Sequence, residues 1–342
     1  MKKIELLKLG LPLFALTAVA AACSDDDNNN KPVDERVISF TAVAERPPRM
    51  AGTTTATLDR FNLYAFTDGK PYRENLLVKK TGGSWSYTPA MYWPATPVNF
   101  FAYSPDISQT ATTRPDGSGV IDDFSNRGDV DLLYAVTMNQ TMKPSPVTLN
   151  FRHALSRVTV MLASNNPNIR VEVAHVALNN VFLKGDFEFP KATTAIDNDV
   201  RGVWSDQSQP ASPLLFYAHG PSDDLVLKSR PVDVADGTLG IYFMIPQKLT
   251  DVSVSGNRYR GNYITVDCKI YDSASGVLLW PNSSTPSYQL VPESDCGRLV
   301  YPLTTPAVKA WEQGTAYVYN ITIDNPAELD DIDFNITVDE YK

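Results

Sequence analysis

The stretch that decides the fold lies near the C-terminus and reads Asp331-Ile332-Asp333-Phe334-Asn335-Ile336-Thr337-Val338-Asp339. Apolar and polar residues alternate throughout it, which is the pattern of a β-strand with one buried and one exposed face. The same period of two recurs along the chain after residue 36, in runs such as 38–43, 61–66, 98–102, 158–162, 264–268 and 317–323. Turn-forming pairs such as Asp68-Gly69 separate these runs. Short strands with this punctuation predict an all-β protein made of sandwiches.

Composition limits the function. The chain has 342 residues, and its 30 Lys and Arg against 39 Asp and Glu give a net charge of −9. This acidic balance argues against nucleic-acid binding, because binding to phosphates needs a basic surface. Three histidines and three cysteines leave few groups for a metal site or a nucleophile–base pair. We therefore predict a protein that is not an enzyme and that needs no metal or cofactor.

The length suits about two domains of roughly 150 residues each. The segment Met142-Lys143-Pro144-Ser145-Pro146 is a candidate connector, because its two prolines stop strand pairing. We therefore expect an N-terminal β-sandwich domain at 37–146 and a C-terminal one at 147–342.

The N-terminus has the features of an export signal. Lys2 and Lys3 precede an apolar run, Leu9 to Ala22, of about 14 residues, which is short for a bilayer span of roughly 20 but suits a signal peptide. The run ends in Ala20-Ala21-Ala22-Cys23, which resembles a bacterial lipobox. We expect a signal peptide at 1–22 and lipid on Cys23, such as palmitate; simple secretion with cleavage after an alanine is the alternative.

Residues 23–36 are expected to form a disordered tether, because the polar run Ser24 to Pro32 can bury little apolar surface. Its acidic residues directly after the cysteine resemble the surface-export signal of Bacteroidetes lipoproteins. The expected location is therefore the outer face of the outer membrane.

Several local strings together resemble one family. They are Trp85–Pro89, Met91–Pro94, Val98–Pro105, Asp131–Ala135, Leu149–Val158, Ile245–Gln247 and Gly314–Ile321. In this order and spacing the chain resembles the fimbrillin family of Bacteroidetes pilus subunits over about residues 38–342. The resemblance implies two transthyretin-like β-sandwich domains in tandem and a lipoprotein precursor matured by an arginine-specific protease. Cleavage would release the first strand, and a C-terminal strand of the next subunit would fill the groove that it leaves.

The first strand is expected at 38–43, with Ile38, Phe40 and Ala42 as the side chains of the displaced strand. A proline-containing segment follows and should be exposed to a protease. Arg46 precedes proline and is the poorer cleavage site, so the bond between Arg49 and Met50 is the expected one. A surface loop with no role in maturation is the alternative interpretation.

At the other end, the resemblance makes 331–339 the candidate donor strand, with Ile332, Phe334, Ile336 and Val338 on its apolar face. The alternative is that this strand simply completes its own C-terminal domain.

The expected function is that of a fimbrial subunit that contributes to cell adhesion. Its partners would be other fimbrial subunits, the outer membrane through its lipid, and a host or bacterial surface receptor or glycan. The alternative is a surface glycan-binding lipoprotein that never polymerises, for which Tyr259 is the best candidate for an exposed aromatic ring.

Two further sets of residues carry expectations. Cys268 lies in a strand-like run and Cys296 in an expected loop; the two could form one disulfide, or stay as free, half-buried thiols. His153 lies in the string Phe151-Arg152-His153-Ala154, where we expect a structural hydrogen bond rather than catalysis.

Overall fold

The computed structural model describes residues 36–45, 52–105, 107–113, 118–126, 128–208, 212–218, 225–235, 243–324 and 334–340. All of them belong to one compact unit, Glu35–Lys342. Its regular structure is β, apart from one short 3-10 turn, Ser287–Gln289, within the residues described. The chain is therefore all-β, as the alternating pattern predicts. None of the described segments forms a helix with the length and hydrophobicity that a bilayer span needs.

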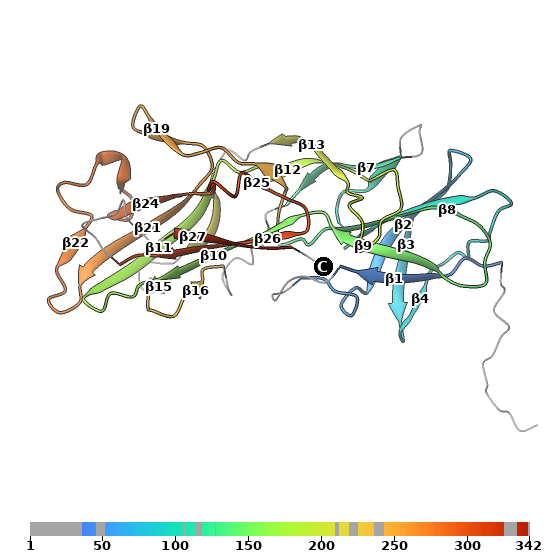
Figure 1. Ribbon diagram of the computed structural model, residues 1–342, viewed down its shortest axis with the longest axis horizontal. Coiled ribbons are helices and arrows are strands. Elements are labelled where there is room, and N and C mark those ends of the chain that lie inside the picture. The colour runs from blue at the N-terminus through green and yellow to red at the C-terminus, as the bar shows by residue number, and fades with distance from the viewer. Residues whose placement is uncertain are drawn as a thin grey trace, which may run out of the picture. The chain divides into compact units, whose positions relative to one another are not determined.

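The first sandwich is built on a seven-stranded sheet (Figure 1). Its strands, in order, are β1 (Phe40–Ala44), β9 (Val147–His153), β8 (Leu133–Gln140), β5 (Val98–Ser104), β2 (Arg60–Thr67), β3 (Lys70–Thr81) and β4 (Ser84–Ser86). A four-stranded sheet faces it, in the order β13 (Val203–Ser208), β12 (Lys184–Glu188), β7 (Gly119–Ser125) and β6 (Ala111–Thr113).

The central strands of the seven-stranded sheet, β2, β5 and β8, are largely buried on both faces. One face packs against the four-stranded sheet through aromatic side chains, among them Tyr134 against Phe187 and Phe101 against Phe189. The other face carries a second core, to which β1 contributes Phe40 and β2 contributes Phe61. Strands β2 and β5 therefore lie between two cores, and their apolar residues on both faces are accounted for.

The second sandwich packs two further sheets around one core. The first holds β16 (Val232–Asp233), β10 (Ser156–Ala163), β26 (Thr315–Thr322) and β27 (Phe334–Glu340), with β17 (Phe243–Met244) also on β10. The second holds β14 (Leu214–Ala218), β11 (Ile169–Asn179), β21 (Tyr263–Asp272), β24 (Cys296–Pro302) and β23 (Leu290–Val291), with β15 (Leu225–Val226) on β11 and β22 (Leu278–Trp280) on β21. Two small pairs complete the described strands, β18 (Gln247–Lys248) with β25 (Ala310–Trp311) and β19 (Ser253–Ser255) with β20 (Arg258–Arg260).

Strand pairing crosses the expected boundary after Pro146. Strand β9 begins at Val147 yet pairs with β1 and β8. Strand β12 pairs with β7 on one edge and with β13 on the other (Figure 1). The first sandwich thus includes residues up to His153 and also the later strands β12 and β13. Two prolines end a strand, but they do not decide which sheet the next strand joins. The ranges 37–146 and 147–342 remain a prediction.

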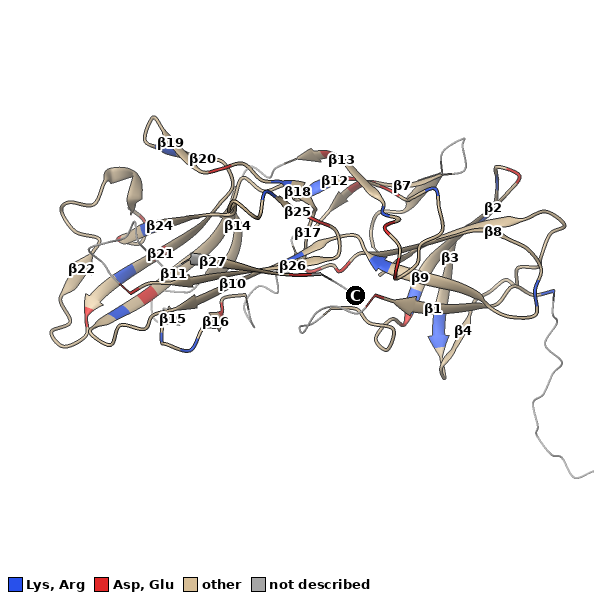
Figure 2. Cartoon of the chain, viewed as in Figure 1, with Lys and Arg blue, Asp and Glu red and all other residues tan. Residues whose placement is uncertain are grey.

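The predicted turn at Asp68-Gly69 joins β2 to β3. Both residues have positive φ, 50° and 69°, as a two-residue hairpin turn requires. Charged positions are scattered over many strands, with red and blue interspersed (Figure 2).

Candidate functional site

The candidate site is the part of the N-terminal sandwich in which the first strand lies. Strand β1 lies at the edge of its sheet and runs parallel to β9, with Phe40 opposite Val147 and Ala44 opposite Phe151. Parallel partners need a long connection, and this one spans roughly a hundred residues. The strand is therefore not part of a hairpin.

The inward side chains of β1, and that of Ile38 just before it, are part of the core. Ile38 is 0% exposed, Phe40 5%, and Ala42 6%. The Phe40 ring lies 5.4 Å from that of Phe100 and 5.8 Å from that of Tyr87, centroid to centroid. Removal of this strand would leave an apolar groove in the sandwich.

On the side away from β9, the start of the strand contacts a second segment, residues 87–93. The Ile38 N–H donates to the Met91 carbonyl at 2.8 Å, and the Trp93 N–H donates to the Arg36 carbonyl at 2.9 Å. The Tyr87 hydroxyl donates to the carbonyl of Ile38. The groove thus lies between β9 and the segment around 87–93.

A buried cluster of charges holds the end of the strand. The Glu45 carboxylate forms an ion pair with Arg152 at 2.8 Å, and both side chains are at most 2% exposed. Arg152 also donates to the carbonyls of Ala195, at 2.9 Å, and Asn198. Buried ions are costly unless they are paired, so Glu45 and Arg152 depend on each other.

The next residue extends this cluster. His153 Nδ1 lies 2.7 Å from the Asp131 carboxylate, and the backbone N–H of His153 donates to the Glu45 carboxylate at 3.3 Å. Burial alone would lower the pKa of His153, but the Asp131 carboxylate and, to a lesser degree, Glu45 outweigh it and raise that pKa above its usual 6.5. The predicted structural hydrogen bond of His153 is thus present.

The cluster lies on both sides of the candidate cleavage segment. Glu45 directly precedes it, and after it the Thr53 N–H donates to the second Asp131 oxygen at 2.7 Å. The Thr55 hydroxyl accepts from the Ala44 N–H at 2.9 Å. The proposed cleavage residues Arg46, Arg49 and Met50 lie outside the described residues, as does the lipid-attachment residue Cys23.

The candidate donor strand begins outside the described residues, at Ile332, and continues as β27. Strand β27 pairs antiparallel with β26 in its own chain, where Ile336 lies opposite Tyr319. Its apolar side is poorly covered there: Ile336 is half-buried and Val338 is 45% exposed.

The two remaining cysteines are free thiols and both are buried. Of the two alternatives, the structure has the free thiols, although they are more deeply buried than expected. Cys296 also begins strand β24 rather than lying in a loop. Burial raises the pKa of the Cys268 thiol well above its usual 9.0, so it is unreactive.

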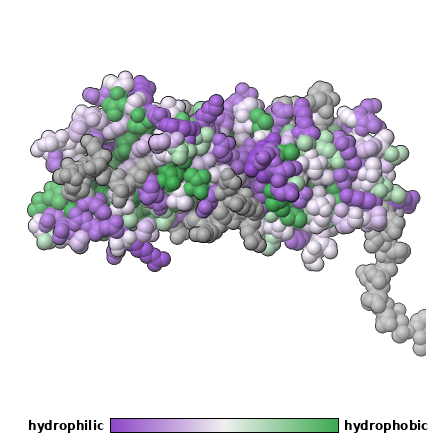
Figure 3. All heavy atoms as spheres, in the orientation of Figure 1, coloured by the Kyte–Doolittle hydropathy of each residue, from purple (hydrophilic) through white to green (hydrophobic). Residues whose placement is uncertain are grey.

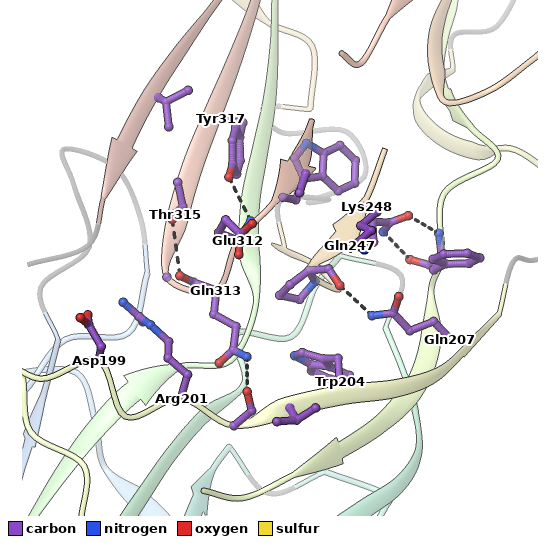
Figure 4. A pocket seen from close by; sticks show the side chains of 18 residues that line it. Asp199, Arg201, Trp204, Gln207, Gln247, Lys248, Glu312, Gln313, Thr315 and Tyr317 are labelled. Atoms are coloured by element: carbon purple, nitrogen blue, oxygen red, sulfur yellow. Dashed lines mark hydrogen bonds between the residues drawn. The ribbon is translucent and has the colours of Figure 1, made fainter. Parts of the chain in front are cut away.

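A hollow of about 1000 Å³ is lined by other residues, among them Trp204, Gln247 and Tyr317 (Figure 4). Two of its polar side chains are engaged within the protein: Gln313 Nε2 donates to the Gly202 carbonyl at 2.6 Å, and Gln207 Nε2 donates to the Pro246 carbonyl at 2.7 Å. The described residues hold no group of three or more His, Cys, Asp or Glu arranged to bind a metal ion.

The glycan alternative depends on exposed aromatic rings. Tyr259 is half-buried, with its ring 5.6 Å from that of Tyr263 and 5.7 Å from that of Tyr288. Tyr92, at 47% exposed, is the most open aromatic side chain among the described residues. The visible surface is mostly hydrophilic with small apolar areas (Figure 3).

Sequence reasoning missed the buried charge cluster. Glu45 directly precedes the proline-containing segment, and its partner Arg152 is 107 positions away in the sequence. One signal could have found it: Arg152-His153 follows the alternating run Val147, Leu149 and Phe151 and precedes the apolar pair Ala154-Leu155. Charges inside such a stretch need partners.

Comparisons with known proteins agree with the fold. A fimbrial protein from Bacteroides vulgatus has a similar structure, with a TM-score of 0.58, 16% identity, and coverage of 90% of this chain and 100% of that chain. A candidate cell adhesion protein from Bacteroides uniformis has a TM-score of 0.50, 14% identity, and coverage of 91% and 100%. A search of curated proteins found no match. Residues 48–340 match the model of the fimbrillin-like family, so the chain belongs to the fimbrillin-like family.

Proposed function

We propose that this chain is a structural subunit of fimbriae that assembles by protease-triggered donor-strand exchange and contributes to cell adhesion. In this proposal Cys23 carries lipid at the outer membrane, and cleavage between Arg49 and Met50 frees the first strand. The strand from about residue 331 onward then enters the groove of the next subunit. The partners are other fimbrial subunits.

One observation carries the proposal. The first strand supplies buried core residues, yet it lies at a sheet edge. An edge strand can leave without breaking the ladders between the remaining strands, and the groove left behind would expose Phe100 and Phe151, now buried. Such a groove favours binding of another strand with matching apolar side chains.

The exposed apolar side of β27 supports the second half of the exchange. Val338 is 45% exposed in its own chain, so this strand gains burial by moving into a neighbour's groove. Fimbrial relatives and the match to the fimbrillin-like family make the same kind of assembly the natural hypothesis.

The test is limited digestion of the full chain with an arginine-specific protease. We expect a new N-terminus at Met50 and a ladder of oligomers that resist detergent. The Arg49→Ala variant should block both, whereas the matched variant Arg46→Ala should behave like wild type. A chain that is cut at this bond and stays monomeric would refute the assembly proposal. Binding of that monomer to polysaccharide would favour the glycan-binding alternative.

Membrane attachment is tested separately. The Cys23→Ser variant should be lost from the membrane fraction of the producing cells, while its purified chain should still form the ladder after digestion. Retention of Cys23→Ser in the membrane would contradict the lipid assignment and leave the strand exchange unaffected.

A further inference from the structure

The C-terminal segment repeats the pattern of the first strand position by position. Residues 38–45 read Ile-Ser-Phe-Thr-Ala-Val-Ala-Glu, and residues 332–339 read Ile-Asp-Phe-Asn-Ile-Thr-Val-Asp. In both segments four apolar residues recur at every second position, and an acidic residue follows the last of them. The correspondences are Ile38 with Ile332, Phe40 with Phe334, Ala42 with Ile336, Ala44 with Val338, and Glu45 with Asp339.

The acidic position matters because of what Glu45 does in the precursor. Its carboxylate is the negative charge 2.8 Å from Arg152, and Arg152 is 2% exposed. If the first strand leaves, Arg152 keeps its backbone acceptors at Ala195 and Asn198 but loses this countercharge. A buried cation without a countercharge is strongly destabilising, so an apolar strand alone cannot restore the site.

We propose that Asp339 of a second copy takes the place of Glu45 beside Arg152 and so fixes the register of the incoming strand. This inference rests on the proposed function and specifies its partner: a segment with four alternating apolar residues and an acid directly after the fourth. The strand enters in the direction of β1, parallel to β9, because only that direction preserves the order of the five positions.

The alternation of apolar residues alone does not fix the register of the incoming strand, so a charged position is needed. A slip of one residue turns the apolar face away from the groove, but a slip of two keeps the alternation intact. In one direction that slip puts Thr337 beside Arg152 and Phe334 at the position of Ala42; in the other it puts Tyr341 beside Arg152. Only the register with Asp339 in place supplies a carboxylate to the buried guanidinium.

The segment is available for this role. In its own chain Asp339 is exposed, as are Asn335 and Thr337, and Ile336 is half-buried. Leaving β26 therefore breaks no buried ion pair of Asp339, whereas entry into the groove would form one.

The experiment compares three full-length variants with wild type after digestion with an arginine-specific protease. Asp339→Asn removes the charge at the critical position. Asp333→Asn is the matched control. It makes the same change at the position that corresponds to Ser39, which is exposed in the first strand. Asp339→Glu restores a carboxylate and tests for rescue. The readout is the rate at which the detergent-resistant oligomers dissociate on dilution. The melting temperature of the undigested chains serves as a folding check.

We expect Asp339→Asn ladders to dissociate on the order of a hundredfold faster than wild type, as when one partner of a buried charge pair is removed. Asp333→Asn and Asp339→Glu should match wild type, and all three undigested variants should melt alike. Equal rates for Asp339→Asn and wild type, or equal damage from Asp333→Asn, would overturn the inference while leaving strand exchange in place. Absence of any wild-type ladder would overturn both.

Discussion

The first strand should contribute a large share of the precursor's stability, and Phe40→Ala measures that share. Phe40 is 5% exposed and its ring packs against Phe100 at 5.4 Å, Tyr87 at 5.8 Å and Phe61 at 6.4 Å. Buried Phe→Ala substitutions cost about 3–5 kcal/mol. An edge strand can shift to close part of the cavity, so we expect the lower end, about 3 kcal/mol.

The assay is equilibrium unfolding in urea, followed by tryptophan fluorescence and circular dichroism. The matched control is Thr41→Ala, one position further along the strand on its exposed face, which should change the free energy of unfolding by no more than about 0.5 kcal/mol. A loss below about 1 kcal/mol for Phe40→Ala would refute the reasoning, because a core aromatic ring cannot be removed so cheaply. In assembled, cleaved chains the substitution should have no effect, since the strand that carries it has left.

Three more predictions concern contacts other than those of Phe40. His153→Asn should lower the melting temperature most below about pH 6.5, with the difference from wild type shrinking as pH rises through the raised pKa of His153; a melting series over about pH 5–9 in which the difference grows would contradict this. Gly261→Ala should destabilise the chain more than Gly276→Ala in urea, because both have positive φ (83° and 72°) but only at Gly261 would a Cβ lie 2.2 Å from a backbone oxygen; equal losses would count against the clash. Tyr319→Phe should cost about 1–3 kcal/mol in the same assay, because it removes the acceptor of the buried Trp311 N–H at 2.8 Å; a neutral result would mean that this hydrogen bond adds nothing.

The alternation of residues was enough to find several strands, although it did not single out long ones such as β3, β8 and β11. The run 61–66 became β2, 98–102 became β5, and the C-terminal alternation became β27, because the side-chain period of two is a local property of the backbone. Turns were equally local, as Asp68-Gly69 illustrates.

Pairing between distant strands was beyond the same reasoning. The parallel contact of β1 with β9, and the return of β12 to β7, depend on the path of the whole chain rather than on any short pattern. The proline-rich segment at 142–146 shows the limit: it ends β8 as expected, yet β9 continues in the same sheet. For the same reason the ion pair of Glu45 with Arg152 emerged only from the structure.

The parallel placement of β1 beside β9 has a mechanical consequence. A strand in a hairpin remains tied to its neighbour by a turn, but β1 is joined to the following residues of the fold only through 46–51. One hydrolysed peptide bond in that link turns an intramolecular segment into a separate ligand, whose departure is then governed by dilution as well as by contact strength. If Cys23 carries lipid as we propose, the same cut would also separate the folded body from the membrane, so one cleavage would both empty the groove and release the subunit.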